Sequence, residues 1–230
     1  PRRKAFWALV ALNAAGFLLQ YVGQTMTTPA RTALLVNASA FAVALLERFA
    51  FGMRLGPART LAIVAGVAGA SLLVAGGDWR SLEGGRLLGD LLALGSGLAW
   101  SVYTVLNREA AAREDPLSLL AWTFALTAVV LLPALALDDA PLSVPAAGWG
   151  PILWAGLATT ALAYALWTFG LRAIRATTSA VLLLVEILVA SALSFAIGRE
   201  TFGPWDYAGA AMLVGAVLAM TLLAPEDQKA

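Results

Sequence analysis

Glu186 is the residue whose type and position point most directly to chemistry. It lies in the middle of an apolar segment, from Ala176 to Gly198, that is long enough to cross a bilayer. A carboxyl group inside a membrane is costly and usually faces protein or a water-filled path. Two interpretations follow: Glu186 binds a cationic group or carries a proton during exchange, or it is a structural carboxyl, neutral or hydrogen-bonded to a neighbouring helix.

Aromatic and polar side chains deep in other apolar segments are further candidates for a binding site. Trp100 and Tyr103 are three residues apart, as are Tyr164 and Trp167, so each pair lies on one face of a helix. Such pairs are suited to line an amphipathic pocket, although packing or an interfacial aromatic belt also explains them. Because Asn37 lies within the membrane, its side-chain amide needs a hydrogen-bond partner in the protein. The predicted substrate-binding residues are Gln20, Tyr21, Asn37, Trp100, Tyr103, Tyr164, Trp167 and Glu186.

The other charges within apolar segments are expected to be structural. Glu47 and Arg48 lie within a turn of the end of their segment, so we predict that both reach the membrane interface as anchors. Asp90 falls in the first turn of its segment, where the helix dipole favours a carboxylate.

The chain contains no histidine and no cysteine. It therefore lacks the commonest general base, the commonest transition-metal ligand and any thiolate. Ser96, between two glycines, has no histidine to activate it as a nucleophile. The acidic residues Glu47, Asp90 and Glu186 lie in separate segments without metal-ligand spacing. We expect no catalytic residue, no metal and no cofactor.

Eight apolar segments position these residues. Of the 230 residues 60% are hydrophobic and only 13% are charged, and the mean hydropathy is +0.81. A soluble domain of this size cannot hide so much apolar surface, and the segments are too long, and lack the alternation, for a β-barrel. We predict an all-α integral membrane protein with transmembrane helices at residues 5–24, 31–53, 58–76, 87–107, 116–137, 149–171, 176–198 and 205–224.

The distribution of basic residues predicts how the chain is oriented. With eight crossings both ends lie on one side of the membrane. Of the 15 lysines and arginines, only Arg31, Arg80, Arg86 and Arg199 lie on the other side. Because cytoplasmic loops are enriched in Lys and Arg, both termini are predicted to be cytoplasmic. The net charge of +1 and the scattered basic residues argue against a nucleic-acid partner.

An internal repeat relates the first three helices to the last three at a separation of 146 residues. The pairs with most weight are Thr32 with Thr178, Gly52 with Gly198, and Gly69 with Gly215. Corresponding helices are five crossings apart, so the two copies run in opposite directions. Inverted repeats recur in secondary transporters, which bind substrate near the midplane between the copies. A five-helix unit repeated twice gives ten helices, so we expect two helices before Pro1.

Several motifs of the second half resemble an EamA unit of the drug/metabolite transporter superfamily. They are Leu88 to Leu94, Ala99 to Leu106, Ala176 to Ala180 followed by Glu186, Gly198-Arg199-Glu200, and Ala208-Gly209 with Gly215. The resemblance implies that residues 1–80 are the last three helices of a first EamA unit and residues 87–225 a complete five-helix second unit. Two positions depart from the pattern: Ile187 stands where a proline is usual, and Arg54 where the second copy has Glu200.

The resemblance also implies a function. A secondary transporter, with export favoured, would move a small metabolite, an amino acid or a drug across the bacterial inner membrane by alternating access, with proton coupling as an option. The family's central cavity is formed by helices matching the first, second, fourth, sixth and seventh predicted here. A channel or a structural membrane protein is the alternative, although no filter-like loop or ring of charges is evident; an intramembrane enzyme is disfavoured.

The expected partners are a small-molecule substrate and membrane lipid. A homodimer is a further option, because Ala62, Gly66 and Ala70 recur every four residues. Small residues at this spacing let helices approach closely, within a bundle or between subunits.

Overall fold

The computed structural model describes residues 3–50, 52, 56–75, 80, 87–137, 144–197 and 203–223. All regular secondary structure in these ranges is helical. Eight helices are long and apolar enough to cross a membrane, which confirms the predicted all-α membrane fold. They cover Lys4–Met26, Arg31–Ala50, Pro57–Ala75, Leu87–Ala111, Pro116–Ala134, Ala146–Leu171, Ala176–Leu193 and Pro204–Leu223. Arg54, Gly198, Arg199 and Glu200, which entered the arguments above, lie outside the described residues.

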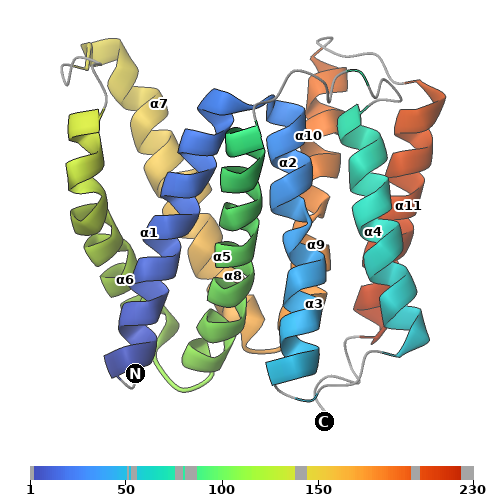
Figure 1. Ribbon diagram of the computed structural model, residues 1–230, viewed down its shortest axis with the longest axis horizontal. Coiled ribbons are helices and arrows are strands. Elements are labelled where there is room, and N and C mark those ends of the chain that lie inside the picture. Colours follow the sequence, from blue (N-terminus) through green and yellow to red (C-terminus); the bar gives the residue numbers. More distant parts are fainter. Residues whose placement is uncertain are drawn as a thin grey trace.

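The first half of the chain contributes four spans (Figure 1). They are formed by α1 (Arg3–Met26), α2 (Pro29–Asn37) with α3 (Ser39–Ala50), α4 (Pro57–Ala75) and α5 (Leu87–Ala111). The start of α2 is fixed locally, because the side chain of Thr28 accepts a hydrogen bond from the backbone N–H of Arg31 at 3.2 Å. Pro29 follows in the first turn, where a missing N–H costs no helical hydrogen bond.

The second half is less regular. The fifth span is α6 (Pro116–Leu131), which ends in the 3₁₀ turn η2 (Leu132–Leu137). The sixth span consists of η3 (Ala146–Gly148), α7 (Trp149–Trp154), the π-helix η4 (Ala155–Leu162) and α8 (Ala163–Leu171). The last two spans are α9 (Ala176–Leu183) with α10 (Val185–Ala196), and α11 (Pro204–Leu223). Pro133 accounts for the change at the end of α6, since proline cannot continue α-helical hydrogen bonding.

Two spans are interrupted in their middle. The second span breaks at Ala38 (φ −59°, ψ −13°), between α2 and α3. The seventh breaks at Leu184 (φ −62°, ψ −16°), between α9 and α10. The two breaks are 146 residues apart, which is the separation of the sequence repeat. Figure 1 shows that α2 and α3 descend through the bundle whereas α9 and α10 ascend.

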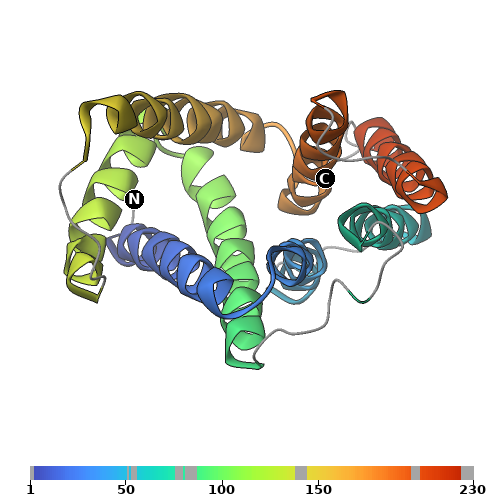
Figure 2. The same ribbon diagram turned by 90° about the horizontal axis from the view of Figure 1, so that it is seen from above.

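Close helix pairs depend on glycine. The two most extensive pairings are α1 with α5 and α4 with α11. Gly69 of α4 faces Gly209 of α11, and a Cβ atom on Gly69 would lie only 2.7 Å from the carbonyl oxygen of Gly209. Seen from above, α5 runs through the middle of the bundle beside α1, and α4 and α11 form one edge (Figure 2). We call the side on which α1 begins and α11 ends the terminal side, and the opposite side the far side (Figure 1).

Candidate substrate-binding site

Seven aromatic rings from four helices lie in contact inside the bundle. This aromatic cluster consists of Phe17 and Tyr21 of α1, Trp100 and Tyr103 of α5, Phe124 of α6, and Tyr164 and Trp167 of α8. The ring centroid of Trp100 is 5.0 Å from that of Phe17 and 5.6 Å from that of Tyr103. The ring centroid of Tyr164 is 4.9 Å from that of Phe124 and 5.6 Å from that of Trp167. These separations are those of favourable edge-to-face aromatic contacts.

Hydrogen bonds fix both indole rings of the cluster. The N–H of Trp100 donates to the side-chain oxygen of Gln20 at 3.1 Å. The N–H of Trp167 donates to the hydroxyl of Ser179, in α9, at 2.8 Å. Because an indole can only donate, each ring is held with its apolar faces free for packing. The cluster thus combines ordered ring faces with a few polar groups.

Exposure changes along the cluster. Tyr103 is 1% exposed, whereas Tyr21, in the last turns of α1, is 63% exposed. Trp100, Tyr164 and Trp167 are half-buried. The cluster is therefore closed around Tyr103 and open at Tyr21.

Glu186 lies close to the aromatic cluster. It occupies the first turn of α10, directly after the break at Leu184, and its side chain is exposed. Its carboxylate is near enough to the phenol of Tyr164 to interact with it electrostatically. The structure thus brings together Gln20, Tyr21, Trp100, Tyr103, Tyr164, Trp167 and Glu186 of the predicted site residues.

Asn37 behaves differently from the other predicted site residues. Its amide donates to the carbonyl oxygen of Ala33, one turn earlier in α2, at 2.7 Å. None of the hydrogen bonds and ring contacts described above joins it to the aromatic cluster. It lies instead at the end of α2, beside the break at Ala38.

Sequence reasoning missed three contributors to the site. Phe17 precedes Tyr21 by one helical turn, and that spacing was the available signal. Phe124 and Ser179 lack a local signal, because only the tertiary fold brings Phe124 to Tyr164 and the hydroxyl of Ser179 to Trp167.

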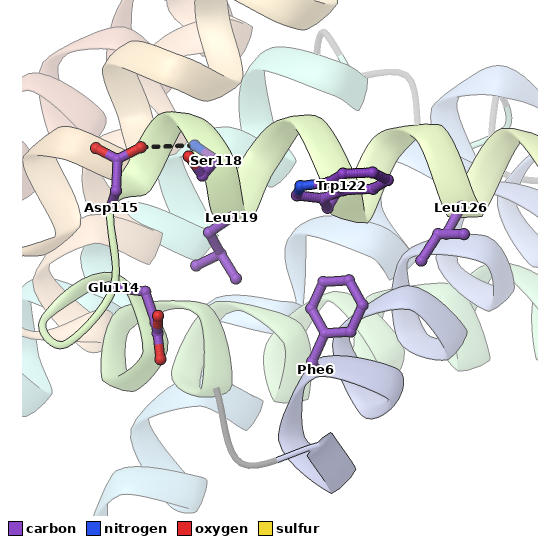
Figure 3. Close-up of a pocket in the computed structure, with 7 residues that line it drawn as sticks. All are labelled: Phe6, Glu114, Asp115, Ser118, Leu119, Trp122 and Leu126. Carbon is purple, nitrogen blue, oxygen red and sulfur yellow. Dashed lines mark hydrogen bonds between the residues drawn. The ribbon is translucent and has the colours of Figure 1, made fainter.

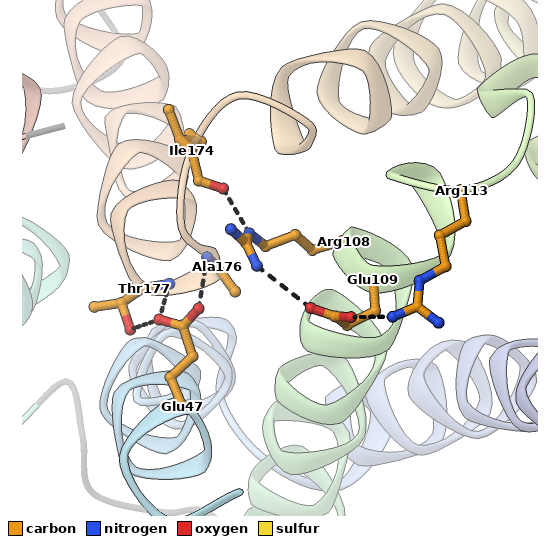
Figure 4. A network of polar contacts seen from close by, with 7 residues as sticks. All are labelled: Glu47, Arg108, Glu109, Arg113, Ile174, Ala176 and Thr177. Carbon is orange, nitrogen blue, oxygen red and sulfur yellow. Dashed lines mark hydrogen bonds and ion pairs between the residues drawn. The ribbon is translucent and has the colours of Figure 1, made fainter. Parts of the chain in front are cut away.

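The structure corrects the interpretation of Glu47 as an interfacial anchor. Its side chain is buried, with 3% exposure, and accepts hydrogen bonds at the start of α9 (Figure 4). The donors are the backbone N–H of Ala176 at 3.0 Å, the backbone N–H of Thr177 at 3.1 Å and the hydroxyl of Thr177 at 2.6 Å. A buried carboxylate is stable when donors satisfy it, which the free amides of a helix start do well.

Asp90 does have the structural role expected of it. Its carboxylate accepts hydrogen bonds from the hydroxyl of Thr27 at 2.6 Å and from the guanidinium Nε of Arg31 at 2.9 Å. It thereby joins the start of α5 to the connection between α1 and α2.

A separate pocket of about 520 Å³ lies at the terminal side, between α1 and α6 (Figure 3). Its lining is Phe6, Glu114, Asp115, Ser118, Leu119, Trp122 and Leu126. The backbone N–H of Ser118 donates to Asp115 at 2.8 Å, which holds the pKa of that carboxyl below its usual value and caps α6. None of the predicted site residues lines this pocket.

Eight helices that are long and apolar enough to cross a membrane define a polytopic integral membrane protein. Within this class, the model of the EamA-like transporter family matches residues 87–222, more than half of the chain. The chain therefore belongs to the EamA-like transporter family.

Curated relatives are also named as transporters. The uncharacterized transporter YyaM of Bacillus subtilis (strain 168) is 26% identical over 184 residues, which cover 78% of this chain and 60% of YyaM. The uncharacterized transporter YwfM of the same organism is 31% identical over 141 residues, which cover 61% of this chain and 47% of YwfM. An uncharacterized transporter of Archaeoglobus fulgidus is 26% identical over 195 residues, which cover 82% of this chain and 66% of that protein. The chain thus spans about half to two thirds of the length of these relatives.

A solved structure shares the fold. It is described only as "Crystal structure of protein", and it superposes with a TM-score of 0.83 at 21% sequence identity. The match covers 98% of this chain and 77% of the solved one.

Proposed function

We propose that the chain forms most of a secondary transporter that carries a small molecule across the bacterial inner membrane by alternating access, without covalent chemistry. The observation that carries the proposal is the aromatic cluster, whose rings come from four different helices and end at the exposed Tyr21. A site built from several spans changes shape when those spans move, which alternating access requires. In this proposal residues 1–80 and 87–225 belong to two inverted units, and transport runs outward from the cytoplasm.

The chemistry of the cluster favours one kind of substrate. Indole and phenol faces attract cations as well as apolar groups, and the carboxylate of Glu186 lies within electrostatic range of Tyr164. We infer a small metabolite, amino acid or drug that combines an amine with an apolar or aromatic body. The breaks at Ala38 and Leu184 support a central site, because transporters form substrate sites at interrupted helices.

The test is substrate counterflow with the purified full-length protein in liposomes. Radiolabelled amino acids, other metabolites and cationic drugs are screened, and a carrier is expected to show saturable counterflow with at least one of them. Trp167→Leu removes a ring that contacts both Tyr103 and Tyr164. Since aromatic contacts contribute about 0.5–2 kcal/mol, the apparent Kd of this variant for a transported amine is expected to rise roughly two- to thirtyfold.

Trp154→Leu is the matched control. Trp154 is 69% exposed, lies in α7 and is outside the aromatic cluster, so its replacement is expected to leave the Kd unchanged. Equal losses of affinity in the two variants would show that the aromatic cluster is not part of the binding site. Flux that never saturates would favour a channel, and chemical turnover of a ligand would favour an enzyme.

A further inference from the structure

The terminal side of the bundle is held by contacts between two groups of helices. In the first group α5 packs against α1, α2 and α3. The second group is the α8–α9 segment, from Ala163 to Leu183, which carries Trp167 and Ser179. In Figure 2 α8 lies across the view from α1, whereas α9 faces α3 and is in contact with it. Three polar contacts described below join the two groups.

Glu47, which is 3% exposed, makes one buried contact of this kind. The segment α9 has Arg175 at its N-cap position, and that side chain makes no capping hydrogen bond. Glu47 of α3 supplies the cap instead, and its two carboxylate oxygens accept from the amides of Ala176 and Thr177. A carboxylate is favoured at a helix start by the free N–H groups and by the helix dipole. The first turn of α9 is therefore capped by a residue more than 120 positions away in the chain.

Two neighbouring contacts act at the same side. Asn107 of α5 donates to the hydroxyl of Thr168 in α8 at 3.2 Å, and both side chains are almost fully buried. The Nε of Arg108 donates to the carbonyl oxygen of Ile174, between α8 and α9, at 2.8 Å (Figure 4). Like Glu47, these side chains belong to the first group and bind the α8–α9 segment.

The capped turn of α9 also reaches the aromatic cluster. Ser179 follows Thr177 by two residues and accepts the indole N–H of Trp167 at 2.8 Å. Trp167 in turn stacks on Tyr103, with ring centroids 6.1 Å apart. A displacement of this turn would move the hydroxyl that holds Trp167, so the cap and the cluster are mechanically connected.

We propose that Glu47 is a positioning residue that ties closure of the terminal side to the geometry of the aromatic cluster. While its carboxylate caps α9, the α3–α9 contact excludes water and Ser179 holds Trp167 against Tyr103. Release of the cap opens the terminal side and frees Trp167 in the same movement. This inference rests on the alternating access proposed above.

The first test measures accessibility at the α3–α9 contact. Because residues 1–230 contain no cysteine, Val43→Cys adds the one thiol of this stretch at a position that is 1% exposed and packs near Ala176 and Ala180. Its reaction with a water-soluble maleimide reports opening. Adding Glu47→Gln removes the charge of the cap and is expected to accelerate labelling about tenfold.

Glu109→Gln is the matched control. Glu109 belongs to the same polar network but pairs with Arg108 and Arg113 of its own α5 region, at 3.5 Å each. Its replacement is expected to leave labelling unchanged. A labelling rate that Glu47→Gln does not raise would overturn the proposal. If Glu47→Gln does not fold, Thr177→Val takes its place, because it removes one of the three donors to Glu47. This variant is expected to accelerate labelling by a smaller factor. A labelling rate equal to that of Val43→Cys alone would overturn the proposal equally.

The second test follows Trp167 itself. With 5-fluorotryptophan the eight tryptophans give separate fluorine resonances, and Trp167→Phe assigns the relevant one. Glu47→Gln is expected to shift and broaden the Trp167 signal and to leave that of Trp154 in place, while Glu109→Gln shifts neither. A merely structural cap, which moves no tryptophan, would leave all signals unchanged. Neither test needs a substrate, so failure of the counterflow screen and failure of the Glu47 proposal are distinguishable.

Discussion

Glu186 is a carboxylate at a depth where charges are rare. It follows the break at Leu184 and occupies the first turn of α10, where the helix dipole favours a negative charge. Its side chain is exposed rather than covered by a neighbouring helix, and Tyr164 is within electrostatic reach. A group in that position is suited to exchange a proton for a substrate cation, because both compete for the same oxygen atoms.

This competition leads to a prediction for Glu186→Gln. The variant keeps the size of the side chain but binds neither a proton nor an amine strongly. Loss of a charge-assisted hydrogen bond, about 1.5–3 kcal/mol, is expected to weaken binding of a transported amine at least tenfold. Uptake by the variant is also expected to lose its dependence on pH. Counterflow measured over a series of pH values provides the check.

Glu114→Gln serves as the control for this experiment, since Glu114 lies at the terminal side and lines the separate pocket. It is expected to keep the affinity and the pH profile of the wild type. Wild-type uptake by Glu186→Gln at every pH would refute the coupling role, while the carrier interpretation would survive.

At the scale of elements, the glycines of α4 and α11 set how closely these two helices pack. Gly69→Ala places a methyl group 2.7 Å from the carbonyl oxygen of Gly209 and 2.8 Å from the amide nitrogen of Leu213. Both neighbours are backbone atoms, so the helices have to separate. Overpacking of this kind costs about 1–3 kcal/mol, and the melting temperature in detergent is expected to fall.

Gly215→Ala is the control for that substitution, because its added Cβ atom meets no atom within 4 Å. The repeat pairs Gly215 with Gly69, yet only Gly69 lies in a tight contact. We expect Gly215→Ala to be neutral or slightly stabilising, since alanine favours helix more than glycine does. Equal melting temperatures for the two variants would show that α4 and α11 do not pack as described.

The spans were predictable from the sequence because each is a long apolar run, and hydropathy alone locates such runs. The pairs Trp100 with Tyr103 and Tyr164 with Trp167 were predictable from helical spacing. The break at Leu184 was not, because its neighbours other than Glu186 are apolar and Ile187 stands where a proline is usual. The sequence repeat relates the position of this break to Ala38, but it does not predict that the helix is interrupted there.

Glu47 shows why the remaining contacts could not be predicted. Its position near the end of an apolar segment is typical of a side chain that reaches the interface. The burial arises from α9, which lies more than 120 residues later and lacks a cap of its own. A local pattern contains no information about such a partner, because the pairing depends on how the two spans pack.

The whole molecule combines two halves that share the position of a helix break. The separation of 146 residues between Ala38 and Leu184 equals the separation of the sequence repeat, and the interrupted spans run in opposite directions (Figure 1). These observations support the proposed inverted units. In such an arrangement a movement that closes one side of the membrane opens the other, and the carboxylate of Glu47 belongs to the terminal side.

The orientation of the molecule in the membrane is the last prediction. Most basic residues within the described ranges lie on the terminal side, so this side is expected to face the cytoplasm. Ala112 and Ala147 are exposed residues next to helix ends on opposite sides, and each can be replaced by cysteine in this cysteine-free chain. In intact cells a membrane-impermeant maleimide is expected to label Ala147→Cys at once, and Ala112→Cys only after permeabilisation. The reverse pattern would invert the topology and would make the contact of Glu47 with α9 an external gate, whereas labelling of both positions in intact cells would contradict a bundle with eight spans.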